Sequence, residues 1–274
     1  MEDLDEDTKW WLGGILDGDG CVSLAGKGQF SLRVKQSEKG VILLQKLQGL
    51  LGGKIHKGER PKKETHRQTY VWGIDINAMV SEVCQNLEKY CHLKRPQMSL
   101  AANLVNSTLE QRHAQIERFK ELKRIPHNPI DHAPLAYVGG IIDTDGGLRV
   151  HPVRVAVGQK YNALPDFLAR EFGGSVTVEN RPHGPFYIWQ IYCTKAVEFL
   201  RRVEPYVYAK SDQVQIILDF ADGKIDRKEA HTRLQKVQGN QGGIKEAYSP
   251  RSKKLTAERK RKYTFDMSHS LWSL

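Results

Sequence analysis

Hydrophobic and polar residues alternate in two stretches of the chain, residues 21–36 and residues 147–160. A period of two residues is typical of a β-strand with one buried and one polar face, so each stretch predicts a β-hairpin. The alternating apolar positions are Phe30, Leu32 and Val34 in the first stretch and Val153, Val155 and Val157 in the second.

The same order of elements surrounds each predicted hairpin. An apolar helix precedes it, and a helical stretch that ends in paired glycines follows it, as expected at the C-terminal end of a helix. Two further strands and another helix complete each half. We therefore predict an α+β fold of two pseudo-symmetric αββαββα domains. The elements after the hairpins are helices at 40–53, about 77–90, 162–174 and about 195–204, and strands at 54–57, 68–75, 175–180 and 186–192.

The segment between the two halves sets the predicted domain boundaries. The N-terminal domain covers residues 1–124 and ends in a long polar helix at about 99–124. Residues 125–134 contain three prolines, which suit a fixed linker. The C-terminal domain then covers residues 135–238.

The last part of the chain, residues 239–274, begins rich in glycine and then becomes strongly basic. Residues 251–262 contain seven Lys or Arg and one Glu. This predicts a basic tail, which is either an arm that touches phosphate groups or a solvated run of charge.

A nine-residue string occurs once in each half, LGGILDGDG at 12–20 and VGGIIDTDG at 138–146. The two copies lie too far apart for a solenoid repeat, so they indicate a duplicated domain. Each glycine inside a helix costs roughly 0.8 to 1 kcal/mol relative to alanine, so the paired glycines need a compensating gain. Two equivalent helices that meet at a pseudo-two-fold axis would use them for close backbone contact.

The string ends in carboxylates at the C-terminal end of a helix, where the helix dipole already disfavours negative charge. If the two helices lie side by side in the same direction, Asp19 and Asp145 converge. Two such carboxylates would raise each other's pKa unless cations neutralise them. A site of oxygen ligands favours Mg²⁺, Mn²⁺ or Ca²⁺ over zinc. The alternative is that each Asp-x-Asp-Gly is only a polar cap and tight turn.

Overall charge indicates the kind of partner. The chain of 274 residues has 42 Lys and Arg against 32 Asp and Glu, a net charge of +10. This favours a nucleic acid, and no membrane association is expected, because no apolar run approaches the roughly 18 residues of a spanning helix. The acidic start MEDLDEDTK resembles neither a signal nor a transit peptide. We expect an intracellular protein, in an organelle (chloroplast or mitochondrion) or the prokaryotic cytoplasm.

With two matched motifs in two matched αββαββα frames, the chain resembles the LAGLIDADG homing endonucleases in their single-chain form. The resemblance covers about residues 8–220. It implies a monomer with saddle-shaped antiparallel sheets over the DNA major groove and the motif helices at the domain interface. It also implies that the second acid of each motif binds the catalytic metal and that the preceding backbone carbonyl is a further ligand. The implied metal ligands are Asp19, Asp145, Gly18 and Thr144.

The metal implied by the resemblance is Mg²⁺, for which Mn²⁺ would substitute, whereas Ca²⁺ would bind without supporting efficient cleavage. The first acids of the motifs, Asp17 and Asp143, are expected to act as turn and cap residues.

Two further pairs match positions that the family uses. A polar residue follows the second strand of each half, Gln36 and Gln159, and a basic residue follows the last domain helix, Lys94 and Lys210. As catalytic residues, the lysines would stabilise developing phosphoryl charge or polarise the attacking water, while the glutamines hold that water. The chain departs from the family because no Arg stands one turn beyond either glutamine. The outer solvent network of the family therefore cannot be carried over to this chain and stays open.

The polar faces of the strands are the predicted DNA-binding surface, since Arg and Gln can pair with base edges and Lys contacts phosphate. The two faces carry different side chains, so a long target without palindromic symmetry is expected. A solvated sheet face is the alternative. The candidate DNA-binding residues are Lys27, Gln29, Ser31, Arg33, Lys35, Lys54 and His56 in the first half and Arg149, His151, Arg154, Ser175, Thr177 and Gln190 in the second.

These features predict a site-specific endonuclease that hydrolyses both strands of double-stranded DNA with a divalent metal, one cut for each half. Two other functions on the same fold remain open. One is a maturase that binds intron RNA and assists splicing, and the other is a DNA-binding regulator that does not cleave. The carboxylates in both motifs favour cleavage, because a regulator has no need of them.

Overall fold

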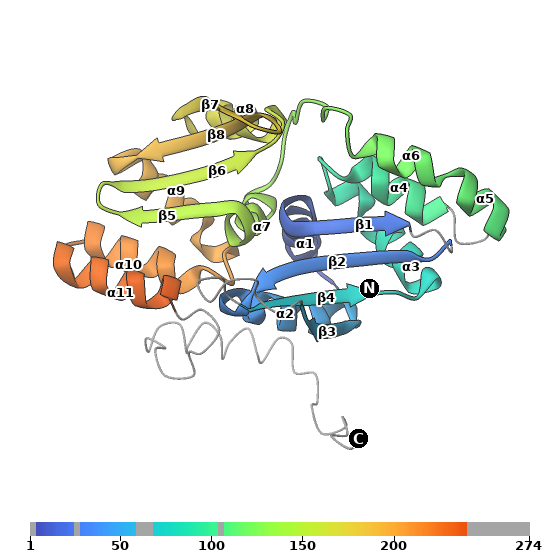
Figure 1. Cartoon of the computed structure of the whole chain (residues 1–274). Coiled ribbons are helices and arrows are strands. Elements are labelled where there is room, and N and C mark those ends of the chain that lie inside the picture. The colour runs from blue at the N-terminus through green and yellow to red at the C-terminus, as the bar shows by residue number, and fades with distance from the viewer. Residues whose placement is uncertain (1–3, 25–27, 59–67, 104–106, 240–274) are drawn as a thin grey trace, which may run out of the picture. The chain divides into compact units, whose positions relative to one another are not determined.

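The computed structural model describes residues 4–24, 28–58, 68–103 and 107–239. Both halves repeat the predicted order of elements (Figure 1), and the α+β fold with two antiparallel sheets is confirmed. The first half consists of α1 (Glu6–Asp19), β1 (Gly20–Leu24), β2 (Phe30–Ser37), the short 3-10 helix η1 (Glu38–Gly40), α2 (Val41–Leu51), β3 (Lys54–Lys57), β4 (Thr69–Ile74), α3 (Asn77–Leu87) and η2 (Glu88–Tyr90). The second consists of α7 (Leu135–Asp145), β5 (Gly146–Val150), β6 (Val153–Gln159), α8 (Ala163–Phe172), β7 (Ser175–Arg181), β8 (Gly184–Tyr192), α9 (Cys193–Val203) and η3 (Glu204–Tyr206).

Each sheet has four strands in equivalent order, β1-β2-β4-β3 in the first half and β5-β6-β8-β7 in the second. A tryptophan occupies the same place in both: Trp72 pairs with Val34, and Trp189 pairs with Val157. Each fully buried indole donates to the carbonyl of the glycine that ends the preceding helix, at 2.8 Å. The two halves therefore fix the sheet against α2 and α8 by the same contact.

Helices cover one face of each sheet, and the other face is turned toward the viewer in Figure 1. The apolar positions of the hairpins lie on the covered face, where Leu32, Val34, Val155 and Val157 have no exposed surface. Because successive side chains of a strand point to opposite sides, the alternating polar residues are placed on the open face.

The hydrophobic cores of the two halves exchange residues near the ends of α1 and α7. Leu93, from the first half, is buried in the core of the second. Tyr208 and Ala209, from the second half, pack on the core of the first, and Trp10 packs on both. The segments that follow η2 and η3 are thus fixed by both halves.

Helices α1 and α7 pack directly against each other, as predicted, but only one glycine of each pair serves that contact. A Cβ atom on Gly14 would lie 2.2 Å from the carbonyl oxygen of Tyr137, and one on Gly140 would lie 2.3 Å from that of Trp11. The other glycine of each pair makes room for the backbone of η2 or η3: a Cβ on Gly13 would lie 2.0 Å from the Tyr90 carbonyl oxygen.

The prediction of one long polar helix at 99–124 is wrong. The described part of this region forms three short helices, α4 (Arg95–Asn103), α5 (Leu109–Ala114) and α6 (Ile116–Leu122). Thr108 explains the start of α5, because it forms a capping box with Gln111 in which each side chain binds the other residue's backbone N–H. Such a box marks the beginning of a new helix.

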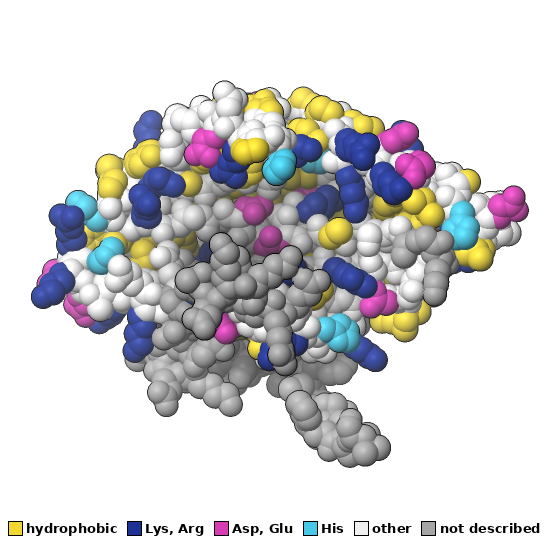
Figure 2. All heavy atoms as spheres, in the orientation of Figure 1, with side chains coloured by type: hydrophobic (Ala, Val, Ile, Leu, Met, Phe, Trp, Pro, Cys, Tyr) yellow, Lys and Arg dark blue, Asp and Glu magenta, His cyan; other side chains and the backbone are white. Residues whose placement is uncertain are grey.

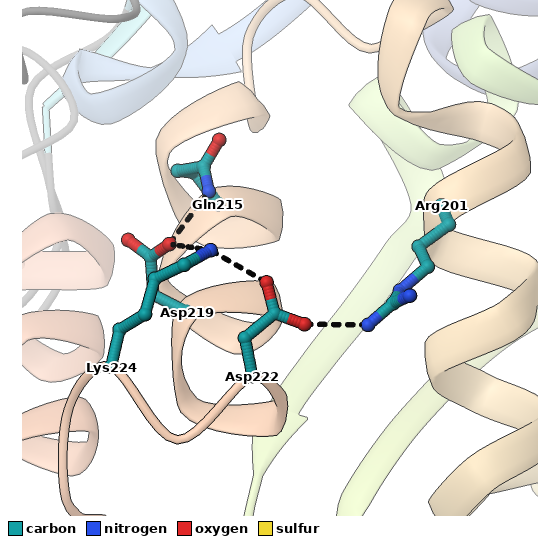
Figure 3. A network of polar contacts seen from close by, with 5 residues as sticks. All are labelled: Arg201, Gln215, Asp219, Asp222 and Lys224. Carbon is teal, nitrogen blue, oxygen red and sulfur yellow. Dashed lines mark hydrogen bonds and ion pairs between the residues drawn. The ribbon is translucent and has the colours of Figure 1, made fainter.

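Two helices after η3 were not predicted, α10 (Ser211–Ala221) and α11 (Arg227–Gly239). A polar network fixes the turn between them (Figure 3): Lys224 bridges Asp219 and Asp222, and Asp222 also binds Arg201 of α9. Helix α10 follows Lys210 as α4 follows Lys94, so it extends the pseudo-symmetry of the two halves. The predicted basic tail lies, from residue 240 onward, outside the described residues. No helix in the described ranges is long and apolar enough to cross a membrane.

Candidate active site and DNA-binding face

The second acids of the motifs, Asp19 and Asp145, are the last residues of α1 and α7. Both are partly buried, and each accepts a hydrogen bond from the glutamine at the end of its own hairpin. Gln36 Nε2 lies 2.5 Å from Asp19 Oδ2, and Gln159 Nε2 lies 2.6 Å from Asp145 Oδ2. The structure therefore brings each predicted acid together with its predicted glutamine.

The two acids also approach each other across the interface between the halves. A Cβ atom on Gly18 would lie only 3.3 Å from Asp145 Oδ2. Burial, and then the negative charge of Asp19, raises the pKa of Asp145 to about 6, although Lys94, Lys210 and the Gln159 hydrogen bond oppose the change. Burial likewise raises the pKa of Asp19 against the same two lysines. Two negative charges that lie close together at a partly buried position raise each other's pKa, and a bound cation would lower it.

The predicted lysines lie beside these acids at the C-terminal ends of the motif helices. Lys94 Nζ donates to the carbonyl oxygens of Leu16, Asp17 and Gly18 at 2.8 to 2.9 Å. Lys210 Nζ donates to those of Thr144 and Gly146 at 2.9 and 2.7 Å. Carbonyl groups at a helix end have no partner within the helix, and a cation there is favourable.

Burial lowers the pKa of both ammonium groups, while nearby carboxylates act in the opposite direction. For Lys94 these are Asp17, Asp145 and Asp19, and for Lys210 they are Asp143, Asp145 and Asp19. Each lysine therefore interacts electrostatically with the second acid of both motifs, so the two sets of predicted catalytic residues form one connected cluster.

The first acids of the motifs hold the lysine segments in place, a more specific role than the predicted turn and cap. Asp17 accepts hydrogen bonds from the backbone N–H groups of His92, Leu93 and Lys94 at 2.6 to 2.9 Å. Asp143 accepts from those of Tyr208 and Lys210 at 2.8 and 2.9 Å. Burial raises the pKa of Asp143 even though these donors act against it.

Each of these first acids also binds an aromatic residue of the opposite motif helix. Tyr137 Oη donates to Asp17 Oδ2, and Trp11 Nε1 donates to Asp143 Oδ2, both at 2.9 Å. Burial, together with Asp17, raises the pKa of Tyr137 well above its usual value, so its hydroxyl remains a donor. Neither aromatic residue was among the predicted site residues, although each immediately precedes its motif.

Oxygen atoms dominate the region where a metal could bind. The candidate donors are the carboxylates of Asp19 and Asp145 and the carbonyl groups of Gly18 and Thr144. Within the described ranges, no group of three or more His, Cys, Asp or Glu side chains could hold a metal ion. The protein donors fit a hard divalent cation that takes its other ligands from water or phosphate rather than a structural zinc.

Most predicted DNA-binding residues lie on the open face of the sheets. In the first sheet, Gly73 of β4 pairs with Arg33 of β2 on one side and with Lys54 of β3 on the other, so the three residues form one row across the sheet. Figure 2 shows Lys, Arg and His side chains over both halves of this side of the molecule. The exposed candidates are Gln29, Arg33, Lys35, Lys54, His56, Arg149, His151, Ser175 and Thr177, and the half-buried ones are Arg154 and Gln190.

Two candidates depart from this picture. Ser31 is on the predicted face but is buried, with its hydroxyl 2.7 Å from that of Ser23, so it offers little surface for the predicted DNA contact. Lys27 lies outside the described residues. Two exposed residues of these strands were not predicted, Cys21 and Tyr192, which pair with Arg33 and Arg154 in the sheets. The alternation in Cys21–Leu24 would have indicated the first.

Arg33 of β2 and Arg154 of β6, the inner strands that pair with β1 and β5, differ in environment. Arg33 forms an exposed ion pair with Asp75 at 3.0 Å. Arg154 has a buried Nε atom without a hydrogen-bond partner among the described residues. The two half-faces therefore present chemically different arginines to a ligand.

No protein-family model and no curated protein matches this sequence. Solved structures do. The LAGLIDADG homing endonuclease I-SmaMI bound to cleaved DNA has a TM-score of 0.55 and 13% identity, over 88% of this chain and 99% of that one. I-SmaMI bound to an uncleaved DNA target with calcium ions has a TM-score of 0.56 and 14% identity, over 87% and 99%.

A second endonuclease gives the same result. The LAGLIDADG meganuclease I-AabMI bound to uncleaved DNA has a TM-score of 0.58 and 16% identity, over 86% of this chain and 98% of that one. At such low identity the likeness concerns the fold, and it extends over both halves. The resemblance found in the sequence is confirmed: this chain has the two-motif, single-chain LAGLIDADG fold.

Proposed function

We propose that this protein is a site-specific endonuclease that hydrolyses both strands of double-stranded DNA with a divalent metal ion. The observation that carries the proposal is the cluster in which Asp19 and Asp145 converge, each with its own glutamine and lysine. A purely structural role would not require two carboxylates to lie close together at a buried position that raises their pKa. The duplication supplies one set of these residues for each strand.

The acids and carbonyl groups at the ends of α1 and α7 fit a divalent cation. Asp19, Asp145, Gly18 and Thr144 would hold it, because all four offer oxygen atoms and the two nearby lysines do not offset the rise in the pKa of the carboxylates. When bound, such an ion supplies Lewis-acid stabilisation of the phosphoryl oxygens and of the leaving oxygen. Mg²⁺ is the expected ion.

The glutamines and lysines have separate tasks in this proposal. The amide N–H of Gln36 or Gln159 fixes the carboxylate that it binds, and the amide oxygen can accept a hydrogen bond from the attacking water. Lys94 and Lys210 hold ammonium groups at the helix ends, where they can stabilise charge that develops on the scissile phosphate. Their low exposure strengthens that effect because water screens them less.

The open faces of the two sheets would bind the duplex and position the two scissile phosphates over this cluster. The side chains of the two half-faces differ, which favours a target without palindromic symmetry. The two endonucleases of the same fold were solved with DNA, one of them both uncleaved with calcium ions and cleaved. This supports DNA as the partner here.

Selection for cleavage in a library of randomised duplex DNA with Mg²⁺ tests the proposal. We expect enrichment of one long target cut on both strands, with no product when EDTA replaces Mg²⁺. The double variant Asp19→Asn/Asp145→Asn, carried through the same selection, controls for a contaminating nuclease. Absence of cleavage by the wild-type protein would overturn the proposal, and specific binding of intron RNA in that case would indicate a maturase.

A further inference from the structure

The aromatic residue before each motif contacts the opposite half of the molecule. Trp11 of α1 and Tyr137 of α7 occupy equivalent positions, directly before Leu12 and Val138. Tyr137 is fully buried, and Trp11 is 6% exposed. Although one is an indole and the other a phenol, each places its polar hydrogen 2.9 Å from the first acid of the other motif. Two different side chains therefore make the same kind of bond.

The contact extends from the acid to the segment that the acid holds. The Tyr137 ring packs edge-on against the ring of His92, with centroids 4.9 Å apart, and the His92 amide binds Asp17. The Trp11 ring packs edge-on against Tyr208 at 6.1 Å, and the Tyr208 amide binds Asp143. Each aromatic residue thus touches both ends of one hydrogen bond in the opposite half.

These hydrogen bonds determine where the lysines lie. Asp17 binds the backbone N–H of Lys94, and Asp143 binds that of Lys210. A lysine has a long flexible side chain, so the placement of its ammonium group depends on how firmly its backbone is fixed. Removing one donor from a buried carboxylate weakens the remaining arrangement, since hydrogen bonds to a charged group are among the stronger ones.

We propose that Trp11 and Tyr137 are positioning residues, each of which fixes the active-site lysine of the opposite half through that half's first motif acid. The inference rests on the proposed endonuclease function for its catalytic consequence. It adds that each cutting centre depends on a side chain from the other domain, so that neither half can form a fully ordered centre alone.

The variants Tyr137→Phe and Trp11→Phe test this with duplex DNA labelled on one strand at a time. We expect Tyr137→Phe to slow one cut about tenfold and leave the other within twofold, so that nicked plasmid accumulates. Trp11→Phe should slow the opposite strand. A loss of general stability would slow both cuts together. The proposal is overturned if both variants slow the same strand, slow both strands equally, or slow neither.

A control variant separates this effect from the loss of any buried hydroxyl. Tyr90→Phe removes hydrogen bonds of 2.7 and 2.9 Å to the carboxylate of Glu6 at the start of α1. This is the same phenol-to-carboxylate chemistry, but it does not involve the motif acids. We expect it to cut both strands at the wild-type rates.

Amide hydrogen exchange tests the inference independently of cleavage. Exchange at His92, Leu93 and Lys94 should quicken about tenfold in Tyr137→Phe, and exchange at Tyr208 and Lys210 should not. Trp11→Phe should show the reverse. Unchanged exchange in the opposite half would overturn the positioning role, whereas a wild-type protein that cuts no DNA would refute only the proposed function.

Discussion

Gly18 and Thr144 occupy the same position of the two motifs and lie against each other across the interface between α1 and α7. A Cβ atom on Gly18 would lie 2.0 Å from Thr144 Oγ1 and 2.7 Å from Thr144 Cβ. The Thr144 hydroxyl is itself within 3.1 Å of the carbonyl groups of Gly140 and Ile141. The two motifs therefore differ at this position because there is room for one side chain but not two.

This relationship predicts a compensating pair of substitutions. Gly18→Ala should lower the free energy of unfolding by about 1 to 3 kcal/mol through overpacking. Adding Thr144→Gly should recover part of the loss, with the remainder due to Asp145 Oδ2, which lies 3.3 Å from the added Cβ. Urea denaturation of both single variants and the double variant measures the coupling. Strictly additive losses would show that the two residues do not compete for space.

Replacing either second acid should stop double-strand cleavage. Asp19→Asn or Asp145→Asn removes a negative charge from the proposed metal site, and cleavage of both strands should fall by at least about a hundredfold, which is roughly 3 kcal/mol in activation free energy. DNA affinity should remain close to that of the wild type, because the proposed DNA-binding surface lies on the sheets. Gel shift and plasmid cleavage assays measure the two properties. Asp166→Asn, at an exposed carboxylate of α8, is the matched control.

Stability without metal should depend on pH through the same acids. The pKa of Asp145 is about 6 in the folded protein, above its usual value of 3.8, so the folded state binds more protons between these values. Proton binding by Asp145 therefore stabilises the folded state at low pH, by up to about 3 kcal/mol in the free energy of unfolding. This stabilisation is lost as the pH rises through about 6. Thermal denaturation in EDTA should give a steeper fall from pH 4 to 7 for the wild type than for Asp145→Asn. Mg²⁺ should reduce the difference, and equal slopes would contradict the assignment.

Close contact between the motif helices should not tolerate a methyl group. Gly14→Ala would place its Cβ 2.2 Å from a backbone oxygen of Tyr137, which cannot move without shifting α7. We expect a loss of about 3 kcal/mol or more in the free energy of unfolding. Gly49→Ala is the control, because this exposed glycine of α2 has nothing within 4 Å of the added Cβ and should gain up to about 1 kcal/mol. Similar results for the two variants in urea denaturation would contradict the packing argument.

DNA affinity should fall steeply with salt, because lysines and arginines on the open faces displace counterions from phosphates. Arg149→Ala should weaken binding and, if Arg149 contacts phosphate, reduce the slope of log affinity against log salt by about one unit; a contact to a base would instead relax discrimination at one base pair. Arg202→Ala, on the helix side of the second sheet, should leave both quantities unchanged. Binding that does not respond to salt would remove the basic faces from the proposal.

The sequence by itself determined the duplicated fold, because each local signal agreed with the same arrangement. Alternation predicted the hairpins, and paired glycines ended α2 and α8. The matched acids, glutamines and lysines could be found because duplication placed each of them twice at equivalent positions. The break between α4 and α5 did have a local signal that was not used, because Thr108 and Gln111 have the Thr-x-x-Gln spacing of a capping box.

Only the tertiary structure decided which contacts these residues make across the interface. Single residues of a repeated motif take different partners: Gly14 faces α7, whereas Gly13 faces η2. Burial of Ser31 and the bonds from Trp11 and Tyr137 to the opposite acids depend on side chains more than a hundred positions away or on a neighbouring strand. A sequence pattern reports periodicity and spacing, but the distances between converging helices are set by packing.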